Sequence, residues 1–145
     1  MTAIDRDLAS ARQAGCPANL LQADLENAPW PLVHQTQPQQ FGAVVVTNYL
    51  WRSLLPTMVA SVAPGGILLY ETFAEGNAEY GRPSRPDFLL KPGELLSTCR
   101  DLTIIAYENG VLDEPRRCVQ RIVAARPPAG ARSASPSGLP AIYTL

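Results

Sequence analysis

The sequence predicts an α/β fold built on a doubly wound, mainly parallel sheet that ends in a C-terminal antiparallel hairpin. Three observations support this prediction. Short apolar runs rich in β-branched residues alternate with runs of helical periodicity, as expected when helices connect parallel strands. Two of the apolar runs lack polar alternation, which is typical of strands covered on both faces. The pattern also opens on only three strand residues, Thr2–Ile4, where about five or six are usual, so we expect a sheet that is incomplete at the N-terminus.

The first forty residues predict strand, helix, strand and linker. After the strand Thr2–Ile4, a helix is expected from about Asp7 to a stop at Gly15. A second short strand is expected within Ala18–Ala23. The segment Gln35–Gln40 is rich in glutamine and lies among prolines, so it predicts a surface loop or a poorly ordered crossover without a packed element.

The middle of the chain carries the strongest strand signals. Phe41–Thr47 is a continuous apolar run rich in valine and predicts a buried parallel strand. Leu50–Val62 has apolar residues at helical spacing and predicts a helix with Pro56 in its first turn. Pro64–Gly66 is expected to end that helix sharply, and Gly66–Glu71 then predicts a second buried strand.

The last third predicts a loop, a short helix and a closing hairpin. Glycines and prolines break any periodicity over residues 73–92, so a loop over the carboxyl edge of the sheet is expected there, followed by a short helix at 93–100. Two strands, 102–107 and 118–125, are expected to pair through a tight, charged turn around Asn109–Arg117.

Composition indicates one domain with a core and a C-terminal tail. The chain is 46% apolar over 145 residues, which is enough for a folded domain. After Arg126 the composition changes to Pro, Gly, Ala and Ser, which predicts a disordered tail at 127–145. The folded domain is therefore expected to span residues 1–126.

Charge and cysteine content exclude several classes of protein. Twelve basic and thirteen acidic residues give a formal charge of -1, with no cationic stretch that would bind nucleic acid electrostatically. Cys16, Cys99 and Cys118 are widely spaced and form no CxxC pair, so we predict neither a disulfide framework nor a metal site. No apolar stretch approaches the length of a membrane span and no cationic leader opens the chain. We expect a soluble, unexported, cytoplasmic protein.

Two carboxylates follow predicted strands and suggest a ligand site. Asp5 and Asp24 each stand where a strand ends, and in open α/β sheets ligands bind outside the carboxyl ends of the strands. A carboxylate can accept hydrogen bonds from both hydroxyls of a vicinal diol, and such charge-assisted bonds are strong. Other roles stay open, because Asp5 and Asp7 are also favoured residues for capping the following helix, and Asp24 could be an ordinary loop carboxylate.

Five segments, taken in order, carry a resemblance to a known family: TAIDRD (2–7), LQAD (21–24), FGAVVVTNYLWR (41–52), PGGILLYETF (64–73) and GRPSRPDFLL (81–90). Together they resemble the class I S-adenosylmethionine-dependent methyltransferases, which have a Rossmann-like fold, and particularly a bacterial group related to the small tellurite-resistance-type enzymes. The resemblance covers residues 2 to about 126. It implies S-adenosylmethionine as cofactor and methyl transfer to a small acceptor, with no dedicated general base, because positioning supplies much of the catalysis in such transfers.

The resemblance also implies roles for six residues. The acidic residue that closes the family's second strand binds the ribose hydroxyls, and its neighbour lies against the adenine. The acidic residue after the third strand accepts from the adenine amino group, and the two residues after the fourth strand line the methionine end and face the acceptor. These roles carry over to Asp5, Arg6, Asp24 with Leu25 beside the ring, and Asn48 with Tyr49.

One part of the family pattern has no counterpart here. The family's Gly-rich first loop, which approaches the amino-acid portion of the cofactor, is not matched by any segment. We therefore expect weak cofactor binding. The family's first strand is central, so its absence implies unpaired backbone along two neighbouring strands. We expect such strands to pair again with each other, to borrow a strand from a partner, or to cause self-association through exposed sheet edges. The alternative function is a non-catalytic remnant of the fold that acts as an interaction module.

Three other polar residues allow two interpretations each. Glu71 could serve as a base, but a structural role at the tip of its strand is favoured. Arg82 and Arg85 lie in the predicted loop over the sheet and could hold an anionic substrate, although exposed arginines are common.

Overall fold

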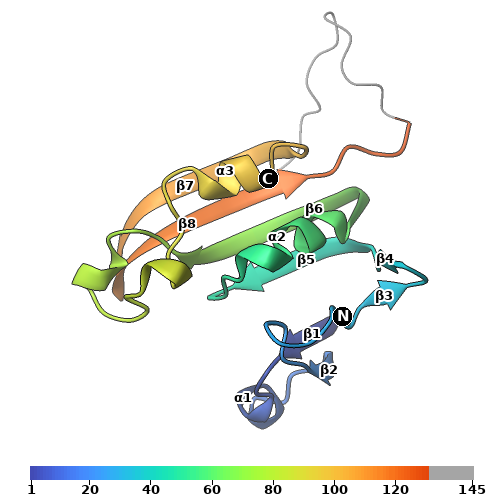
Figure 1. Cartoon of the computed structure of the whole chain (residues 1–145), viewed down its shortest axis with the longest axis horizontal. Coiled ribbons are helices and arrows are strands. Elements are labelled where there is room, and N and C mark those ends of the chain that lie inside the picture. The colour runs from blue at the N-terminus through green and yellow to red at the C-terminus, as the bar shows by residue number, and fades with distance from the viewer. Residues whose placement is uncertain (131–145) are drawn as a thin grey trace, which may run out of the picture. The chain divides into compact units, whose positions relative to one another are not determined.

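The computed structural model describes residues 1–130, which form two compact units, 1–39 and 40–130 (Figure 1). In the first unit, two strands form a parallel pair, with Thr2 opposite Asn19 and Asp5 opposite Gln22. A short helix connects them. The elements of this unit are β1 (Thr2–Asp5), α1 (Ala9–Gln13), β2 (Asn19–Gln22), β3 (Val33–His34) and β4 (Gln37–Pro38). The predicted strand, helix and strand are therefore confirmed, with a helix shorter than expected.

The segment Gln35–Gln40 contains part of a small, largely exposed hairpin, which was not predicted within the expected surface loop. The two-residue strands β3 and β4 pair antiparallel, with Val33 opposite Pro38 and His34 opposite Gln37. The turn between them places Gln35 at a positive φ of 56°. Glutamine and proline are weak strand formers, so the sequence pattern did not indicate this small hairpin.

The second unit contains a four-stranded mixed sheet in the order β5-β6-β8-β7. Strands β5 and β6 are parallel, whereas β6 pairs antiparallel with β8, and β8 with β7. The α/β class and the closing antiparallel hairpin are thus confirmed, but this sheet is mixed and not mainly parallel. The elements are β5 (Phe41–Thr47), η1 (Arg52–Leu54), α2 (Leu55–Ala60), β6 (Val62–Phe73), η2 (Asn77–Glu79), η3 (Pro86–Phe88), α3 (Glu94–Thr98), β7 (Thr103–Asp113) and β8 (Arg116–Ala125).

The helix expected over Leu50–Val62 is shorter because its end belongs to the sheet. Helix α2 has Pro56 in its first turn, as predicted, and ends at Ala60. The Phe41 N–H donates to the Ser61 carbonyl (2.8 Å), and Val62 pairs with Phe41, so β6 begins at once. The segment Pro64–Gly66 therefore lies inside a strand and is no helix stop.

Gly66 is required where β5 and β6 come close together. A Cβ on Gly66 would lie 2.9 Å from the carbonyl oxygens of both Ala63 and Gly42. This close approach coincides with the register shift between Phe41 and Ala43 on β5. Glycine is the residue that permits such contact between backbones.

The turn of the closing hairpin lies in the later part of its predicted range, Asn109–Arg117, and the Asn109-Gly110 part of that range is no turn. Asn109 and Gly110 lie within β7 and face Gln120 and Val119 of β8. The chain reverses later, at residues 114–115, directly after the pair Asp113 and Arg116. An Asn-Gly dipeptide often marks a hairpin turn, but here the pairing of the flanking residues continues through it.

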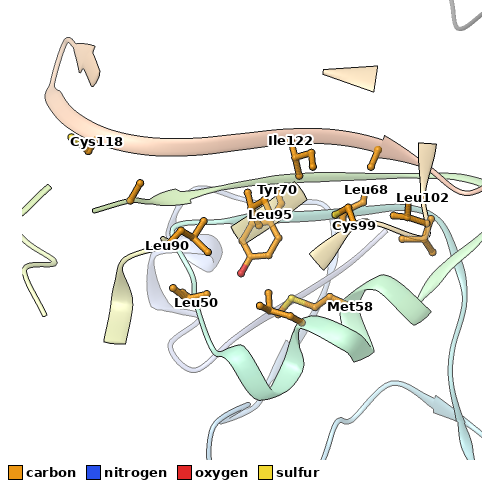
Figure 2. Close-up of a cluster of buried hydrophobic side chains, with 14 residues drawn as sticks. Leu50, Met58, Leu68, Tyr70, Leu90, Leu95, Cys99, Leu102, Cys118 and Ile122 are labelled. Carbon is orange, nitrogen blue, oxygen red and sulfur yellow. The ribbon is translucent and has the colours of Figure 1, made fainter. Parts of the chain in front are cut away.

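The core of the second unit lies between one face of the sheet and the helices α2 and α3 (Figure 2). Met58 of α2 and Leu95 of α3 pack with Leu68, Tyr70 and Ile122 from the two central strands. All five side chains are buried. Helix α2 follows β5, and α3 follows the 74–93 loop. Both helices return over this face of the sheet and cover it.

Arg126 links the end of the sheet to α2. Its N–H donates to the Gly66 carbonyl, while its guanidinium donates to the carbonyls of Val59 (2.8 Å) and Val62 (2.7 Å) at the end of the helix. A cation at a helix C-terminus also complements the helix dipole.

The predicted tail lies for the most part outside the described residues. Across residues 1–130 the structure has no helix with the length and apolar character that crossing a bilayer requires.

Candidate functional site

Asp5 is the last residue of β1 and has one carboxylate oxygen available for a ligand. Its Oδ1 accepts the backbone N–H of Asp7 (2.9 Å), which forms a tight local turn. Its Oδ2 accepts no hydrogen bond from residues 1–130, and the side chain is exposed. Asp7 makes a similar turn, because its Oδ1 accepts the N–H of Ala9 (2.9 Å), the first residue of α1, while the N-cap position itself is Leu8, which makes no side-chain cap hydrogen bond. Asp5 can therefore keep its turn and still accept from a hydroxyl.

Asp24 is more engaged by its own loop. Its Oδ1 accepts the N–H groups of Glu26 (3.0 Å) and Asn27 (3.3 Å), and its Oδ2 accepts the side-chain amide of Asn27 (2.9 Å). The hydrogen bond from the Asn27 side chain is the largest of the effects that lower the pKa of Asp24. The carboxylate is ionised at neutral pH, and Oδ2 retains room for one further donor.

The parallel pairing of β1 and β2 places both carboxylates at one edge of the pair. Asp5 is opposite Gln22, and the Ala23 N–H donates to the Asp5 carbonyl (3.0 Å), so Asp24 follows directly. The other two predicted adenine-binding residues, Arg6 and Leu25, directly follow Asp5 and Asp24 in the sequence. The Arg6 carbonyl accepts the Gln22 amide (3.0 Å), and Arg6 is among the charges that lower the pKa of Asp24.

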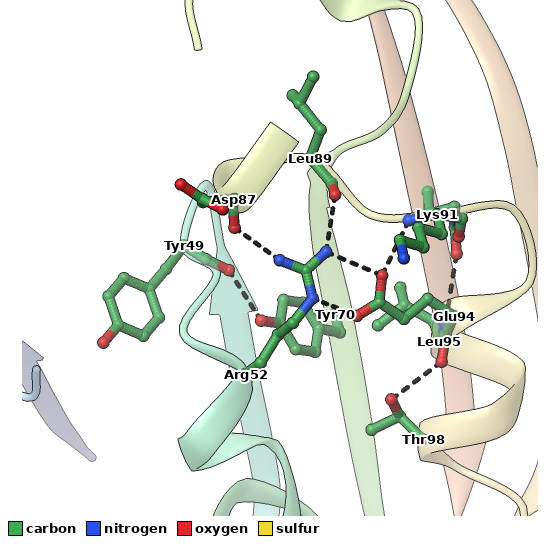
Figure 3. A network of polar contacts seen from close by, with 10 residues as sticks. Tyr49, Arg52, Tyr70, Asp87, Leu89, Lys91, Glu94, Leu95 and Thr98 are labelled. Carbon is green, nitrogen blue, oxygen red and sulfur yellow. Dashed lines mark hydrogen bonds and ion pairs between the residues drawn. The ribbon is translucent and has the colours of Figure 1, made fainter. Parts of the chain in front are cut away.

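Asn48 and Tyr49 belong to the second unit and follow β5. Asn48 is exposed and has a positive φ of 53°, a conformation that asparagine tolerates better than most residues. Its N–H donates to the Glu71 carbonyl (3.0 Å), so it also shapes the turn at the strand tip. The Tyr49 carbonyl accepts the buried Tyr70 hydroxyl (2.8 Å), and the Tyr49 ring points away from this contact (Figure 3).

Arg52 holds the loop before α3 against the segment that follows β5 (Figure 3). Its guanidinium donates to both carboxylate oxygens of Glu94, at 2.7 and 3.0 Å. It also donates to the carbonyls of Asp87 (2.7 Å) and Leu89 (2.8 Å). Glu94 further accepts the Lys91 N–H (2.8 Å). We call this set the Arg52 clamp; it fixes residues 87–94 at the carboxyl end of the sheet.

The Arg52 clamp lowers the pKa of Glu94. Burial alone would raise this pKa, but the hydrogen bonds from Arg52 and from the Lys91 N–H outweigh it. The hydrogen bond with Glu94 likewise raises the pKa of Arg52. Since the folded state favours the ionised carboxylate, the stability that the pair contributes is present above the ordinary pKa of Glu94, near 4.5, and is lost as the pH falls through the lowered value.

We therefore expect a pH-dependent effect of Glu94→Gln. The free energy of unfolding should differ between wild type and variant most at about pH 6–7, and this difference should shrink as the pH falls below about 4.5. Urea unfolding across this pH range measures it. Asp101→Asn is the matched control, because the Arg100 and Asp101 pair is largely exposed, with side chains 81% and 78% accessible. A wild-type advantage over Glu94→Gln that is the same at every pH would contradict the assignment.

Two buried polar side chains fix the rest of the loop region. Asn77 donates its amide to the Pro83 carbonyl (2.9 Å) and accepts the Cys118 N–H (3.1 Å). Gln120 donates to the Lys91 carbonyl (2.6 Å) and accepts the Leu95 N–H (3.3 Å). Both are fully buried. The loop over residues 74–94 is thus anchored to β8 at two points.

Two other charged residues singled out in the sequence, Glu71 and Arg85, have charged partners. Glu71 accepts hydrogen bonds from Arg121 Nε (2.6 Å) and from Arg117 (3.1 Å), which favours its structural role. Arg85 pairs with Asp87 on the surface and stacks over Phe88. Among residues 1–130, no group of three or more His, Cys, Asp or Glu side chains could hold a metal ion.

Burial keeps the Cys99 thiol protonated. Desolvation raises the pKa of Cys99 to about 11, so this thiol is protonated at neutral pH. Cys118 is also buried, and Cys16 is partly accessible. The two core cysteines act as small apolar side chains.

Sequence reasoning did not identify the Arg52 clamp, Asn77 or Gln120. Arg52 stands in a matched segment, but Glu94 lies 42 residues away and nothing local links the two. Gln120 did carry a signal, because it is the one uncharged polar residue with a long side chain in the largely apolar run 118–125, where Arg121 is the one charged residue. A buried amide in such a run usually has hydrogen-bond partners.

No protein-family model matches this sequence, and no curated protein matches it. Solved structures do share its fold. TehB from Haemophilus influenzae aligns with a TM-score of 0.59 at 16% identity, over 86% of this chain. The N-methyltransferase NodS from Bradyrhizobium japonicum aligns with a TM-score of 0.60 at 15% identity, over 87% of this chain and 72% of NodS.

A third similar structure contains S-adenosyl-L-homocysteine. The glycopeptide N-methyltransferase MtfA, in complex with S-adenosyl-L-homocysteine, has a TM-score of 0.51 at 17% identity, over 87% of this chain and 72% of MtfA. The chain therefore has the fold of S-adenosylmethionine-dependent methyltransferases. It spans 49% of the length of TehB.

Proposed function

We propose that this chain binds S-adenosylmethionine at the carboxyl ends of its parallel strands and serves methyl transfer to a small acceptor, as in the tellurite-resistance-type group. The observation that carries the proposal is the position of Asp5 Oδ2, which lies at the end of a parallel strand and accepts no hydrogen bond from the described residues 1–130. The fold shared with TehB, NodS and MtfA supports it. Ligands bind at this edge of open α/β sheets.

In this proposal each residue contributes a contact that its chemistry allows. Asp5 accepts from the ribose hydroxyls, and Asp24 accepts from the adenine amino group through Oδ2. Arg6 and Leu25 lie against the adenine ring. When bound, the cofactor supplies a methyl group on a positively charged sulfur. Asn48 and Tyr49 keep, as predictions, the roles toward the methionine end and the acceptor that the family resemblance implies.

Cofactor binding can be tested with Asp5→Asn. The amide oxygen can still accept the Asp7 N–H, so the local turn is kept while the charge is lost. We expect binding of S-adenosylhomocysteine to weaken by about tenfold or more, because charge-assisted hydrogen bonds are lost. NMR titration or calorimetry measures this. Asp5→Ala should weaken binding at least as much.

Asp7→Asn provides the matched control. It makes the same chemical change two residues away and keeps an oxygen that can accept the Ala9 N–H. It should leave affinity within about twofold of wild type. Equal affinities of wild type and Asp5→Asn would remove Asp5 from the site. Absence of any binding in the wild type would count against the proposed function as a whole.

One observation favours the alternative of an interaction module. Strand β5 has no partner strand on its outer side among the described residues, and its Val45 side chain is 65% exposed. A module of this kind would show no stabilisation by S-adenosylhomocysteine. Thermal unfolding with and without that compound separates the two functions, since a ligand that binds only the folded state raises the unfolding temperature.

A further inference from the structure

Tyr70 brings a polar group into the apolar core of the second unit. Its side chain is 2% exposed and lies within the core cluster. A buried hydroxyl costs free energy unless it has a hydrogen-bond partner, and phenylalanine would fill nearly the same volume without that cost. The hydroxyl has a partner here, because it donates to the Tyr49 carbonyl (2.8 Å). This contact joins the core to the segment that follows β5.

The Tyr70 hydroxyl keeps its proton and therefore remains a donor. Burial raises the pKa of Tyr70, and the neighbouring side chains of Tyr49 and Glu94 act in the same direction, whereas Arg52 opposes them. The deprotonated form, which could not donate to a carbonyl, is thus disfavoured.

The segment that Tyr70 contacts has an uncommon backbone conformation. Thr47 is the last residue of β5 and pairs with Glu71, and Asn48 then takes a positive φ of 53°. Residues other than glycine keep such a conformation only where the surroundings fix it, and these conformations are concentrated at functional sites.

Two successive residues of β6 fix this segment. The Glu71 carbonyl accepts the Asn48 N–H (3.0 Å), and the Tyr70 hydroxyl donates to the carbonyl of the next residue, Tyr49. Figure 3 shows the Tyr70 hydroxyl directed at that carbonyl. Because β5 and β6 are parallel, their carboxyl ends lie at the same edge of the sheet. Ligands bind at this edge in open α/β sheets.

We propose that Tyr70 is a positioning residue, whose hydroxyl sets the backbone of Asn48 and Tyr49 for contact with a ligand at the carboxyl edge of the sheet. This inference rests on the proposed function, in which that ligand is S-adenosylmethionine. Tyr70 is buried and acts through the Tyr49 carbonyl. Without the hydroxyl, the Tyr49 peptide group can rotate and Asn48 can relax toward the negative φ that most residues adopt.

The experiment is amide hydrogen exchange of the full chain and of Tyr70→Phe. Protection of the Asn48 N–H should fall by about fivefold, because the segment loses one of its two fixing hydrogen bonds. Replacement of Tyr70 by 4-aminophenylalanine keeps a donor at the same place and should restore the protection. The affinity for S-adenosylhomocysteine should also fall by about fivefold in Tyr70→Phe and return with the restored donor.

Tyr107→Phe is the matched control in the same sheet. The Tyr107 hydroxyl accepts the Gly93 N–H (3.1 Å), and its side chain packs against the same core cluster. This variant should lower the protection of Gly93 and leave both the protection of Asn48 and the affinity for S-adenosylhomocysteine as in wild type. A general loss of stability would not separate the two amides in this way.

Wild-type protection of Asn48 in Tyr70→Phe would overturn the proposal. So would an equal loss of that protection in Tyr107→Phe, or no recovery with 4-aminophenylalanine. If the wild type binds S-adenosylhomocysteine, an unchanged affinity of Tyr70→Phe would overturn it as well. The exchange of Asn48 is measured without ligand, so failure of this inference is distinguishable from the absence of binding that would count against the proposed function.

Discussion

Replacement of Arg52 by alanine is expected to free the loop before α3 and to lower the free energy of unfolding by about 2 kcal/mol. The variant loses four hydrogen bonds from one guanidinium, two to Glu94 and one each to the Asp87 and Leu89 carbonyls. It also leaves the Glu94 carboxylate without its cationic partner. The unfolding temperature should fall by about 4–8 °C.

Hydrogen exchange locates this effect on the chain. Amide protection should decrease around residues 87–94 in Arg52→Ala and stay unchanged in the strands of the central sheet. Arg52→Lys should recover only part of the loss, because an ammonium group cannot form the same fork of hydrogen bonds. Arg85→Ala is the control, since the Arg85 and Asp87 side chains are 71% and 73% exposed. A loss of stability in Arg85→Ala equal to that in Arg52→Ala would argue against a specific clamp.

Asn77→Asp is expected to destabilise the second unit by about 3–5 kcal/mol at neutral pH. The change keeps the size of the side chain and the acceptor for the Cys118 N–H. It replaces the donor to the Pro83 carbonyl with a charged oxygen, in a position that is 1% exposed. A buried carboxylate beside a carbonyl oxygen has a raised pKa.

The pH dependence identifies the cause of this effect. Once protonated, the new carboxylic acid can donate to the Pro83 carbonyl, so the deficit relative to wild type should shrink as the pH falls below the raised pKa. Asn109→Asp makes the same change at an exposed position on β7 and should cost less than about 0.5 kcal/mol. Chemical unfolding of the three proteins at several pH values measures both. A deficit of Asn77→Asp that does not change with pH would point to packing and not to the lost donor.

The elements predicted well are those for which local and tertiary preferences agree. Strand β5 has the predicted bounds, Phe41–Thr47, because its β-branched residues favour an extended backbone and its alternate side chains reach the core. The prediction that it is covered on both faces is wrong among the described residues, since Val45 is 65% exposed. The predictions that were wrong concern local signals that pairing overrode. Asn109 and Gly110 favour a turn, but ten continuous residues of β8 pair along β7, and the chain reverses beyond them.

The candidate site also has features that the sequence predicted and features that it did not. That Asp5 and Asp24 follow neighbouring strands was predictable, because parallel strands separated by a helix give such neighbours. That Asp24 is held by three hydrogen bonds from its own loop was open in the sequence. The contacts of Arg52 with Glu94, and of Asn77 with Cys118, join residues about forty positions apart. Such pairs depend on the packing of whole elements, and no periodicity or motif indicates them.

The position of Arg126 sets a lower bound on the length of any shortened protein. This residue binds both the last turn of α2 and the strand β6, through Val59, Val62 and Gly66. A chain cut after Ala125 would keep every strand of the sheet yet leave the carboxyl end of α2 without its cation. Fragments designed for crystallisation or NMR should therefore retain Arg126 with its guanidinium intact.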